Sequence, residues 1–142
     1  MHSDTEVVFF LGDGISDIEE IASSHPAIFF IAVRGNCDLS YSFLSRPLLK
    51  TEEITLDGNH ILLTHGDLYG VKAGLSELCS LAESRGADII LFGHTHTPLE
   101  KYFSLGERSY YIFNPGSASV RDRSYGILTT GKTPFFSVGR ID

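Results

Sequence analysis

The chain has 142 residues and a formal net charge of −7, with 42% hydrophobic and 20% charged residues. This composition is typical of a soluble globular domain and excludes a membrane helix, because no apolar stretch approaches about 20 residues. The acidic balance argues against a nucleic-acid groove, which normally carries a basic stripe. Cys37 and Cys79 form no CxxC pair, so we expect neither a disulfide framework nor a zinc knuckle. With no signal peptide in view, a cytoplasmic location is expected.

The first quarter of the chain predicts strand, helix and strand. Val7–Leu11 is a short, continuous apolar run of strand-forming residues, which favours a strand buried on both faces. Ser16, followed by Glu19 at the spacing of a capping box, predicts the start of a helix that runs toward Pro26. Residues 27–33 then form a second apolar run, which predicts a second buried strand.

A hairpin and a second helix are predicted next. Residues 53–56 and 60–64 flank the Asp57-Gly58 pair, a sequence that is typical of a tight hairpin turn. Residues 71–84 have the apolar periodicity of a helix, and Gly86 is placed as its C-cap.

The remaining strands complete the predicted fold class. Residues 88–92 form a third buried strand, and shorter segments with more alternation follow at 101–103, 110–114, 126–129 and 135–138. The order is α/β first and antiparallel β afterwards, without repeats or linkers. We therefore expect one domain over residues 1–142, with a mixed sheet folded into a two-sheet sandwich.

Each predicted buried strand ends in polar residues beside glycine. In an open α/β sheet such residues converge at the carboxyl edge of the strands, where sites form. Carboxylate, amide and imidazole groups together suit a divalent cation such as Mn²⁺, Fe²⁺ or Zn²⁺, and glycine leaves room for a sharp turn. The candidate ligands are Asp13, Asn36, His65, His94 and His96.

Each candidate has a plainer interpretation when it is taken alone. A Gly-Asp pair after a strand is usually a turn, and His65 could be a hydrogen-bonded core histidine. His94 and His96 face the same way only if the segment stays extended. Ligand-type residues at four separate strand ends are nevertheless more than packing alone would select.

Five ordered motifs carry a family resemblance: LGD (11–13), GNCD (35–38), THGD (64–67), GHTHTP (93–98) and NPGS (114–117). Together they resemble the calcineurin-like metallophosphoesterases, and most of all their small single-domain phosphodiesterase branch. The resemblance implies an α/β fold, a two-sheet β-sandwich flanked by helices. It also implies phosphodiester hydrolysis by a metal-activated hydroxide at a dinuclear centre.

The resemblance also implies ligand roles. Asp13 would bridge two metals, Asn36, His65 and His94 would complete the second metal site, and His96 would bind the first. Mn²⁺ is the expected cofactor, with Zn²⁺, Fe²⁺ and Ni²⁺ as alternatives. A complete site holds two ions, of which one is better supported in this chain. The NPGS turn would support the edge of the site.

Four further residues are assigned to chemistry or to substrate. Cys37 and Asp38 occupy the catalytic position, although Cys37 stands where the wider family has a histidine that helps the leaving group. Arg34 could contact the substrate phosphate or be a solvated loop residue. Asp67 stands where close relatives often have a second histidine, and it could repel an anion or bind metal as an oxygen ligand.

One family element has no counterpart in this sequence. The family opens with a strand that ends in Asp-x-His, whereas six residues precede Val7 and a parallel crossover needs about a dozen. The sequence therefore predicts a missing first strand, a weakly held first metal and an open sheet edge that favours a homo-oligomer. The expected substrate is a small phosphodiester or phosphomonoester. The alternative is a non-catalytic interaction scaffold on the same fold, like the related retromer subunit.

Overall fold

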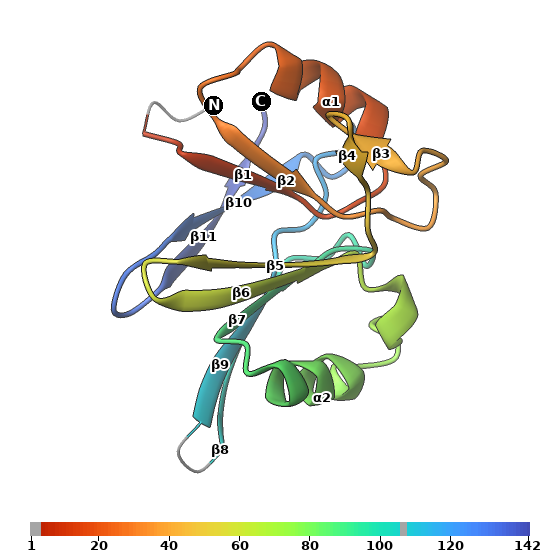
Figure 1. Ribbon diagram of the computed structural model, residues 1–142. Coiled ribbons are helices and arrows are strands. Elements are labelled where there is room, and N and C mark those ends of the chain that lie inside the picture. The colour runs from red at the N-terminus through yellow and green to blue at the C-terminus, as the bar shows by residue number, and fades with distance from the viewer. Residues whose placement is uncertain (1–3, 106–107) are drawn as a thin grey trace.

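The computed structural model describes residues 4–105 and 108–142. It has four layers, in which helix α1 covers a layer of two-stranded sheets, a five-stranded sheet follows, and helix α2 covers the far face (Figure 1). The predicted α/β class, a two-sheet sandwich flanked by helices, is confirmed. Across the described residues, no helix has the length and apolar character needed to span a membrane.

The five-stranded sheet sets the position of the site. Its order is β5 (Thr51–Leu56), β6 (Asn59–Thr64), β7 (Ile89–Phe92), β9 (Arg108–Asn114) and β8 (Leu99–Leu105). Strands β6, β7 and β9 are parallel, so their carboxyl ends meet at one edge of the sheet. Strands β5 and β8 are antiparallel to their neighbours. The predicted turn between β5 and β6 is confirmed, with Asp57 and Gly58 both at positive φ.

The second layer consists of two separate pairs of strands. Strands β1 (Val7–Phe10) and β2 (Phe29–Ala32) are parallel, whereas β10 (Ser124–Thr129) and β11 (Phe135–Arg140) are antiparallel. Both pairs pack on the same face of the five-stranded sheet through one apolar cluster. Among the described residues, no ladder joins the two pairs. The short strands β3 (Ser42–Phe43) and β4 (Arg46–Pro47) were not predicted by the sequence.

Helix α1 (Ile15–Ser23) begins before the predicted cap. Ser16 was expected at the N-cap, but it lies inside the helix, and Gly14 occupies the N-cap without a side-chain cap of its own. The Asp38 carboxylate accepts the free N–H groups of Gly14 and Ile15 instead. The prediction was wrong because the group that satisfies this helix end lies 23 to 24 residues away in sequence.

The second predicted helix is shorter than its apolar pattern suggested. Helix α2 spans Ser76–Arg85 and ends at Gly86, whose left-handed conformation confirms the predicted C-cap. Residues 71–75 are not helical, because Gly74 has φ 154° and Val71 is buried as part of a turn. A 3₁₀ turn, η1 (Asp67–Tyr69), precedes them. A buried valine in a turn contributes to helical periodicity without forming a helix.

Candidate metal centre

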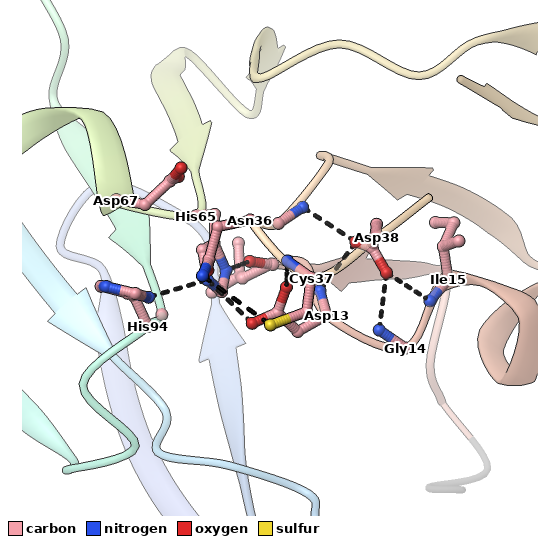
Figure 2. A network of polar contacts seen from close by, with 12 residues as sticks. Asp13, Gly14, Ile15, Asn36, Cys37, Asp38, His65, Asp67 and His94 are labelled. Carbon is pink, nitrogen blue, oxygen red and sulfur yellow. Dashed lines mark hydrogen bonds and ion pairs between the residues drawn. The ribbon is translucent and has the colours of Figure 1, made fainter. Parts of the chain in front are cut away.

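Four of the five predicted ligands lie together at the carboxyl edge of the strands. Asp13 follows β1, Asn36 follows β2, His65 follows β6 and His94 follows β7. Figure 2 shows their side chains directed toward one another from these four segments, which come from both sheet layers. The site is thus assembled where the two layers of the sandwich meet.

His65 is at the centre of this cluster. Its Nε2 atom lies 2.9 Å from Oδ1 of Asn36, 3.1 Å from Nδ1 of His94 and 3.2 Å from Oδ2 of Asp13. Its Nδ1 atom lies 2.6 Å from the carbonyl oxygen of Leu11, to which it donates its proton. Nε2 therefore presents a lone pair, as in metal-binding histidines that donate their other ring N–H to a backbone carbonyl.

The cluster has the donor set and spacing that fit a cation. Neither the Asn36 oxygen nor the Asp13 carboxylate can donate a proton to His65 Nε2, so acceptor atoms face one another at short range. Ligand atoms that share a cation at about 2.0–2.2 Å lie about 3–3.5 Å apart. The separations around Nε2 are close to this range. Two nitrogens and two oxygens suit a borderline divalent cation.

The surroundings keep His94 in the form that binds metal. His65 is 2% exposed. Burial is the largest cause that lowers the pKa of His94, and its electrostatic interactions with His65 and Lys72 add to it, so the His94 imidazole is neutral near pH 7. Metal binding requires neutral imidazole, and no proton has to be displaced from His94 first.

Two glycines allow the strand ends to approach His65. A Cβ on Gly35 would overlap the Asp13 carboxylate, and a Cβ on Gly12 would lie 2.7 Å from Nδ1 of His65. Gly12 also has φ 101°, a conformation that side chains disfavour. The glycines that the sequence placed beside the ligands are therefore needed for this close contact.

Three of the predicted ligands have a strained backbone. Asp13, His94 and His96 adopt φ values of 63°, 68° and 63°, in the left-handed region that non-glycine residues rarely enter. Such residues cost on the order of 1–3 kcal/mol each and gather at functional sites. The turns aim the side chains of Asp13 and His94 at His65.

The Asp38 carboxylate ties two of these segments together. Its oxygens accept hydrogen bonds from the backbone N–H groups of Asp13 (2.8 Å), Gly14 (2.8 Å), Ile15 (3.1 Å) and Gly35 (2.8 Å). Burial raises the pKa of Asp38, but these four donors together hold it below its usual value. These hydrogen bonds show that Asp38 positions the segments that carry Asp13 and Gly35. A direct role of Asp38 in catalysis stays a prediction.

Cys37 lies next to the cluster and contacts Asp13 twice. Its backbone N–H donates to Oδ1 of Asp13 at 2.7 Å, and its exposed thiol also hydrogen-bonds to that carboxylate. The negative charge of Asp13 is the largest cause that raises the pKa of the Cys37 thiol. The thiol is therefore protonated near pH 7, and its expected catalytic role stays a prediction.

The two predicted substrate residues have partners of their own. The Arg34 guanidinium lies 4.5 Å from the centroid of the Tyr41 ring, a cation–π contact. Asp67 accepts a hydrogen bond from Nζ of Lys50 at 3.1 Å. This ion pair offsets the repulsion that Asp67 would exert on an anion. The sequence carried no signal for Lys50, because the contact joins the residue before β5 to the start of η1, 17 residues further along the chain.

His96 is not part of the cluster. Its side chain is half exposed, and Nδ1 lies 3.6 Å from Oδ2 of Asp122. Residues 93–95 form a tight turn in which the N–H of Thr95 donates to the carbonyl of Gly93. The segment is not extended, so His94 and His96 do not face the same way. Asp122 lies in a loop outside every motif, and no signal in the sequence could have found it.

Asn114 supports the turn that carries His94. It is fully buried at the end of β9, and its Nδ2 donates to the Gly93 carbonyl (3.1 Å) and to Oγ1 of Thr95 (2.9 Å). Its Oδ1 accepts the N–H of Gly116 at 2.8 Å. Asn114 thus links the 93–95 turn to the NPGS segment, at the edge of the site.

Comparison with known proteins assigns the chain to a family. A family model described as the calcineurin-like phosphoesterase superfamily domain matches residues 1–133, and the chain belongs to this family. The probable metallophosphoesterase YsnB of Bacillus subtilis (strain 168) is 36% identical over 131 residues, covering 89% of this chain and 70% of YsnB. A probable metallophosphoesterase of Methanocaldococcus jannaschii is 30% identical over 118 residues, covering 83% of this chain and 56% of that protein.

Solved structures share the same fold. Vacuolar protein sorting 29 from Cryptosporidium parvum has a TM-score of 0.78 at 17% identity, with 99% of this chain and 78% of that chain covered. A structure described as a novel archaeal phosphodiesterase has a TM-score of 0.70 at 20% identity, with 98% and 85% covered. At these identities the likeness concerns the fold.

Proposed function

We propose that the chain is a metal-dependent phosphoesterase that hydrolyses phosphodiesters. The observation that carries this proposal is the set of lone-pair atoms from Asp13, Asn36 and His94 around Nε2 of His65. Membership of the calcineurin-like phosphoesterase family and the archaeal phosphodiesterase fold support it. A small phosphodiester or phosphomonoester is the proposed substrate.

A divalent cation is the proposed cofactor, with Mn²⁺ as the first choice. Asp13, His65 and His94 offer ligand atoms that all lie within 4.8 Å of one another, and Asn36 adds an amide oxygen. A Vps29 from Entamoeba histolytica, with TM-score 0.59 and 20% identity, was solved with Zn²⁺, which keeps Zn²⁺ as an alternative beside Fe²⁺ and Ni²⁺. A second cation, held by Asp13 and His96, belongs to the same proposal.

The residues of the chain prepare the site for phosphoryl chemistry. A bound divalent cation would supply Lewis-acid chemistry, polarising the phosphoryl group and lowering the pKa of water. The Leu11 carbonyl fixes the tautomer of His65, and the Cys37 N–H fixes the Asp13 carboxylate. Because these side chains are oriented before substrate arrives, little reorganisation is needed during reaction.

The test combines metal binding with turnover. The chain is titrated with Mn²⁺ by calorimetry and then assayed with bis(p-nitrophenyl) phosphate. We expect binding and hydrolysis in the native chain and the loss of both in His65→Ala. His25→Ala is the matched control, because His25 is exposed and lies at the end of α1. A chain that hydrolyses the diester equally well with His65→Ala refutes the proposed site.

The alternative function is a non-catalytic interaction scaffold. The likeness to Vps29 is the observation that favours it, and it concerns the fold alone. The same experiment separates the two functions. A scaffold can bind Mn²⁺ but shows no hydrolysis of mono- or diesters above the His65→Ala background, whereas an enzyme shows both.

Homo-oligomerisation and a cytoplasmic location stay predictions. The observation that favours oligomers is the free edge of β1. One edge of β1 pairs with β2, and among the described residues no strand pairs with its other edge. Unpaired edges are templates for another chain. Light scattering checks this, with a dimer or larger species expected. Val7→Lys, at the start of β1 and outside the apolar clusters, should shift the population toward monomer, and a native chain that is monomeric at all concentrations contradicts the prediction.

A further inference from the structure

A cavity lies between the GHTHTP segment and the last hairpin of the chain, which β10 and β11 form. Its volume is about 330 Å³, at the lower end of the range for small-molecule sites. The strand residues that line it come from the beginning of β10 and the end of β11, which pair with each other. The lining includes His96, Pro98, Asp122, Ser124, Val138 and Arg140.

Two glycines hold the hairpin close to the rest of the site. A Cβ on Gly126, in β10, would lie 2.6 Å from the ring of Phe113 on β9. A Cβ on Gly116, in the NPGS turn, would overlap Oγ of Ser124 and lie 3.0 Å from Pro98. The NPGS turn is therefore packed between two residues that line the cavity, one from the hairpin and one from the GHTHTP segment.

The cavity adjoins the candidate metal centre. His96, which lines it, comes two residues after His94, so their Cα atoms are at most about 7.6 Å apart. The Asn114 side chain bonds both to the 93–95 turn and to the N–H of Gly116. The turn that aims His94 at His65 is thus fastened to the NPGS segment beside the cavity. A ligand whose phosphoryl group lies at the cluster can extend a further group into this cavity.

Arg140 lies on the inner face of the hairpin. Phe136 of β11 is buried in the apolar core on the five-stranded sheet. Because side chains alternate along a strand, Val138 and Arg140 lie on the same face as Phe136, beyond the end of the core. Both residues line the cavity, and the Arg140 side chain remains exposed there. The inner face of β11 thus places a guanidinium in the cavity.

The Arg140 guanidinium has no protein partner. Across residues 4–105 and 108–142, it makes no hydrogen bond, ion pair or ring contact. The Asp122 carboxylate in the same cavity is engaged elsewhere. It accepts a hydrogen bond from Oγ of Ser119 at 3.0 Å and lies 3.6 Å from Nδ1 of His96. Arg140 is therefore free to bind an anion, and a guanidinium binds phosphate through two parallel N–H bonds.

We propose that Arg140 binds a second phosphate group of the substrate, in the cavity beside the metal centre. The proposal rests on the proposed phosphoesterase function and narrows its substrates to esters that carry a further phosphate. The reacting phosphoryl group lies at the cluster around His65, and the second phosphate accepts hydrogen bonds from Arg140. Pro98 and Val138 offer apolar contacts to the group that joins the two phosphates.

Two matched nucleotides separate the second phosphate from the first. Thymidine 3′,5′-bisphosphate and thymidine 5′-monophosphate are each titrated by calorimetry into the Mn²⁺-loaded chain. The variants are Arg140→Met, Arg140→Lys and the control Arg121→Met, an exposed arginine outside the cavity lining. We expect the native chain to bind the bisphosphate about tenfold or more tightly than the monophosphate. Arg140→Met should lose this preference, Arg140→Lys should keep part of it, and Arg121→Met should keep all of it.

Each outcome decides for or against the second phosphate. A preference that survives in Arg140→Met overturns the proposal, and so does a native chain without the preference. If Arg140→Met weakens both nucleotides equally, Arg140 contacts the phosphate that they share, and the assignment is wrong. Unchanged urea unfolding of Arg140→Met shows that a lost preference does not come from a damaged fold. If the native chain binds no Mn²⁺, the proposed function fails, and the same titrations without metal still show whether Arg140 distinguishes the two nucleotides.

Discussion

His94 and His96 lie two residues apart, yet the structure places them in different environments. His94 faces the buried His65 at 3.1 Å, whereas His96 is half exposed and lies beside Asp122. Both residues have left-handed backbone conformations. The difference shows that motif membership alone does not place a side chain in a site; the direction of each turn has to be known.

The two environments also differ in what holds them. The cluster around His65 is fixed by sheet ladders, by the Leu11 carbonyl and by the four hydrogen bonds of Asp38. The His96–Asp122 contact joins two loops across 3.6 Å. An exposed pair of this kind contributes little to stability. The cluster around His65 is therefore held in place for a cation, whereas the position of the His96 side chain depends on the conformation of its loop.

The largest effect is expected at the contact between the segments that follow β1 and β2, which carries Asp13 into the cluster. Gly35→Ala introduces a Cβ that overlaps the Asp13 carboxylate, so the strand ends must separate. We expect a loss of about 3 kcal/mol in the free energy of unfolding and no measurable Mn²⁺ binding. Urea unfolding and calorimetry measure the two quantities.

The matched control for this change lies in the same site. A Cβ on Gly93 would be 3.5 Å from its nearest neighbour, an ordinary contact, so Gly93→Ala should cost less than about 1 kcal/mol. Mn²⁺ affinity should then stay close to native. If Gly35→Ala and Gly93→Ala behave alike, the close approach of Gly35 to Asp13 is not what holds the site together.

Alanine substitution of the histidines tests the comparison directly. His65→Ala or His94→Ala removes a ligand from the cluster, and we expect Mn²⁺ affinity to fall at least about 100-fold, more than for supporting residues. His96→Ala should change the Mn²⁺ affinity of the site around His65 by less than about threefold, because His96 lies outside this cluster, and should weaken only the proposed second cation. Electron paramagnetic resonance of free Mn²⁺ gives all affinities. Equal losses for His94→Ala and His96→Ala would show that both bind the cation.

The parts of the site that the sequence could predict follow from strand geometry. Parallel strands place their carboxyl ends at one edge, so the approximate meeting of Asp13, Asn36, His65 and His94 followed from four predicted strands and the residues after them. The Asp57-Gly58 turn and the Gly86 cap were likewise predicted from local chemistry and are confirmed.

The parts that failed depend on contacts between distant segments. The start of α1 was misplaced because Asp38 caps it from another loop. Neither the Lys50–Asp67 pair nor the Asp122 contact leaves a periodic signal, since each joins residues outside the regular strands and α-helices. The turn at 93–95 depends on the backbone angles of His94, and sequence patterns do not specify such angles for non-glycine residues.

A smaller effect is expected at Asp38, which supports the cluster without joining it. In Asp38→Asn one carboxylate oxygen is replaced by an amide that cannot accept, so some backbone N–H groups lose their partner. We expect a loss of about 2 kcal/mol in the free energy of unfolding at pH 7. Asp17→Asn, in the first turn of α1, is the control, with a loss below about 1 kcal/mol.

The pH dependence of this loss follows from the lowered pKa of Asp38. A carboxyl group whose pKa is lower in the folded state stabilises the fold above its usual pKa of 3.8, and that contribution disappears as pH falls through the folded value. The difference between the native chain and Asp38→Asn should therefore narrow below pH 3.8. A difference that stays constant down to pH 2 contradicts the assigned hydrogen bonds.

The smallest expected effect is a change in the reactivity of Cys37, which reports on Asp13 from outside the cluster. The Asp13 carboxylate is the largest cause that raises the pKa of this thiol above 9.0, and only the thiolate reacts with iodoacetamide. In metal-free protein with Cys79→Ala, alkylation at pH 8 should be several-fold slower than in an unstructured cysteine peptide. Because Cys37 is exposed, limited access does not explain slow reaction.

Two variants test the cause. Asp13→Asn should shift the pH profile of alkylation toward lower pH and raise the alkylation rate at pH 8. Asp122→Asn, beside His96, should leave both the profile and the rate unchanged. Equal profiles in the native chain and Asp13→Asn would show that Asp13 does not face Cys37 in solution.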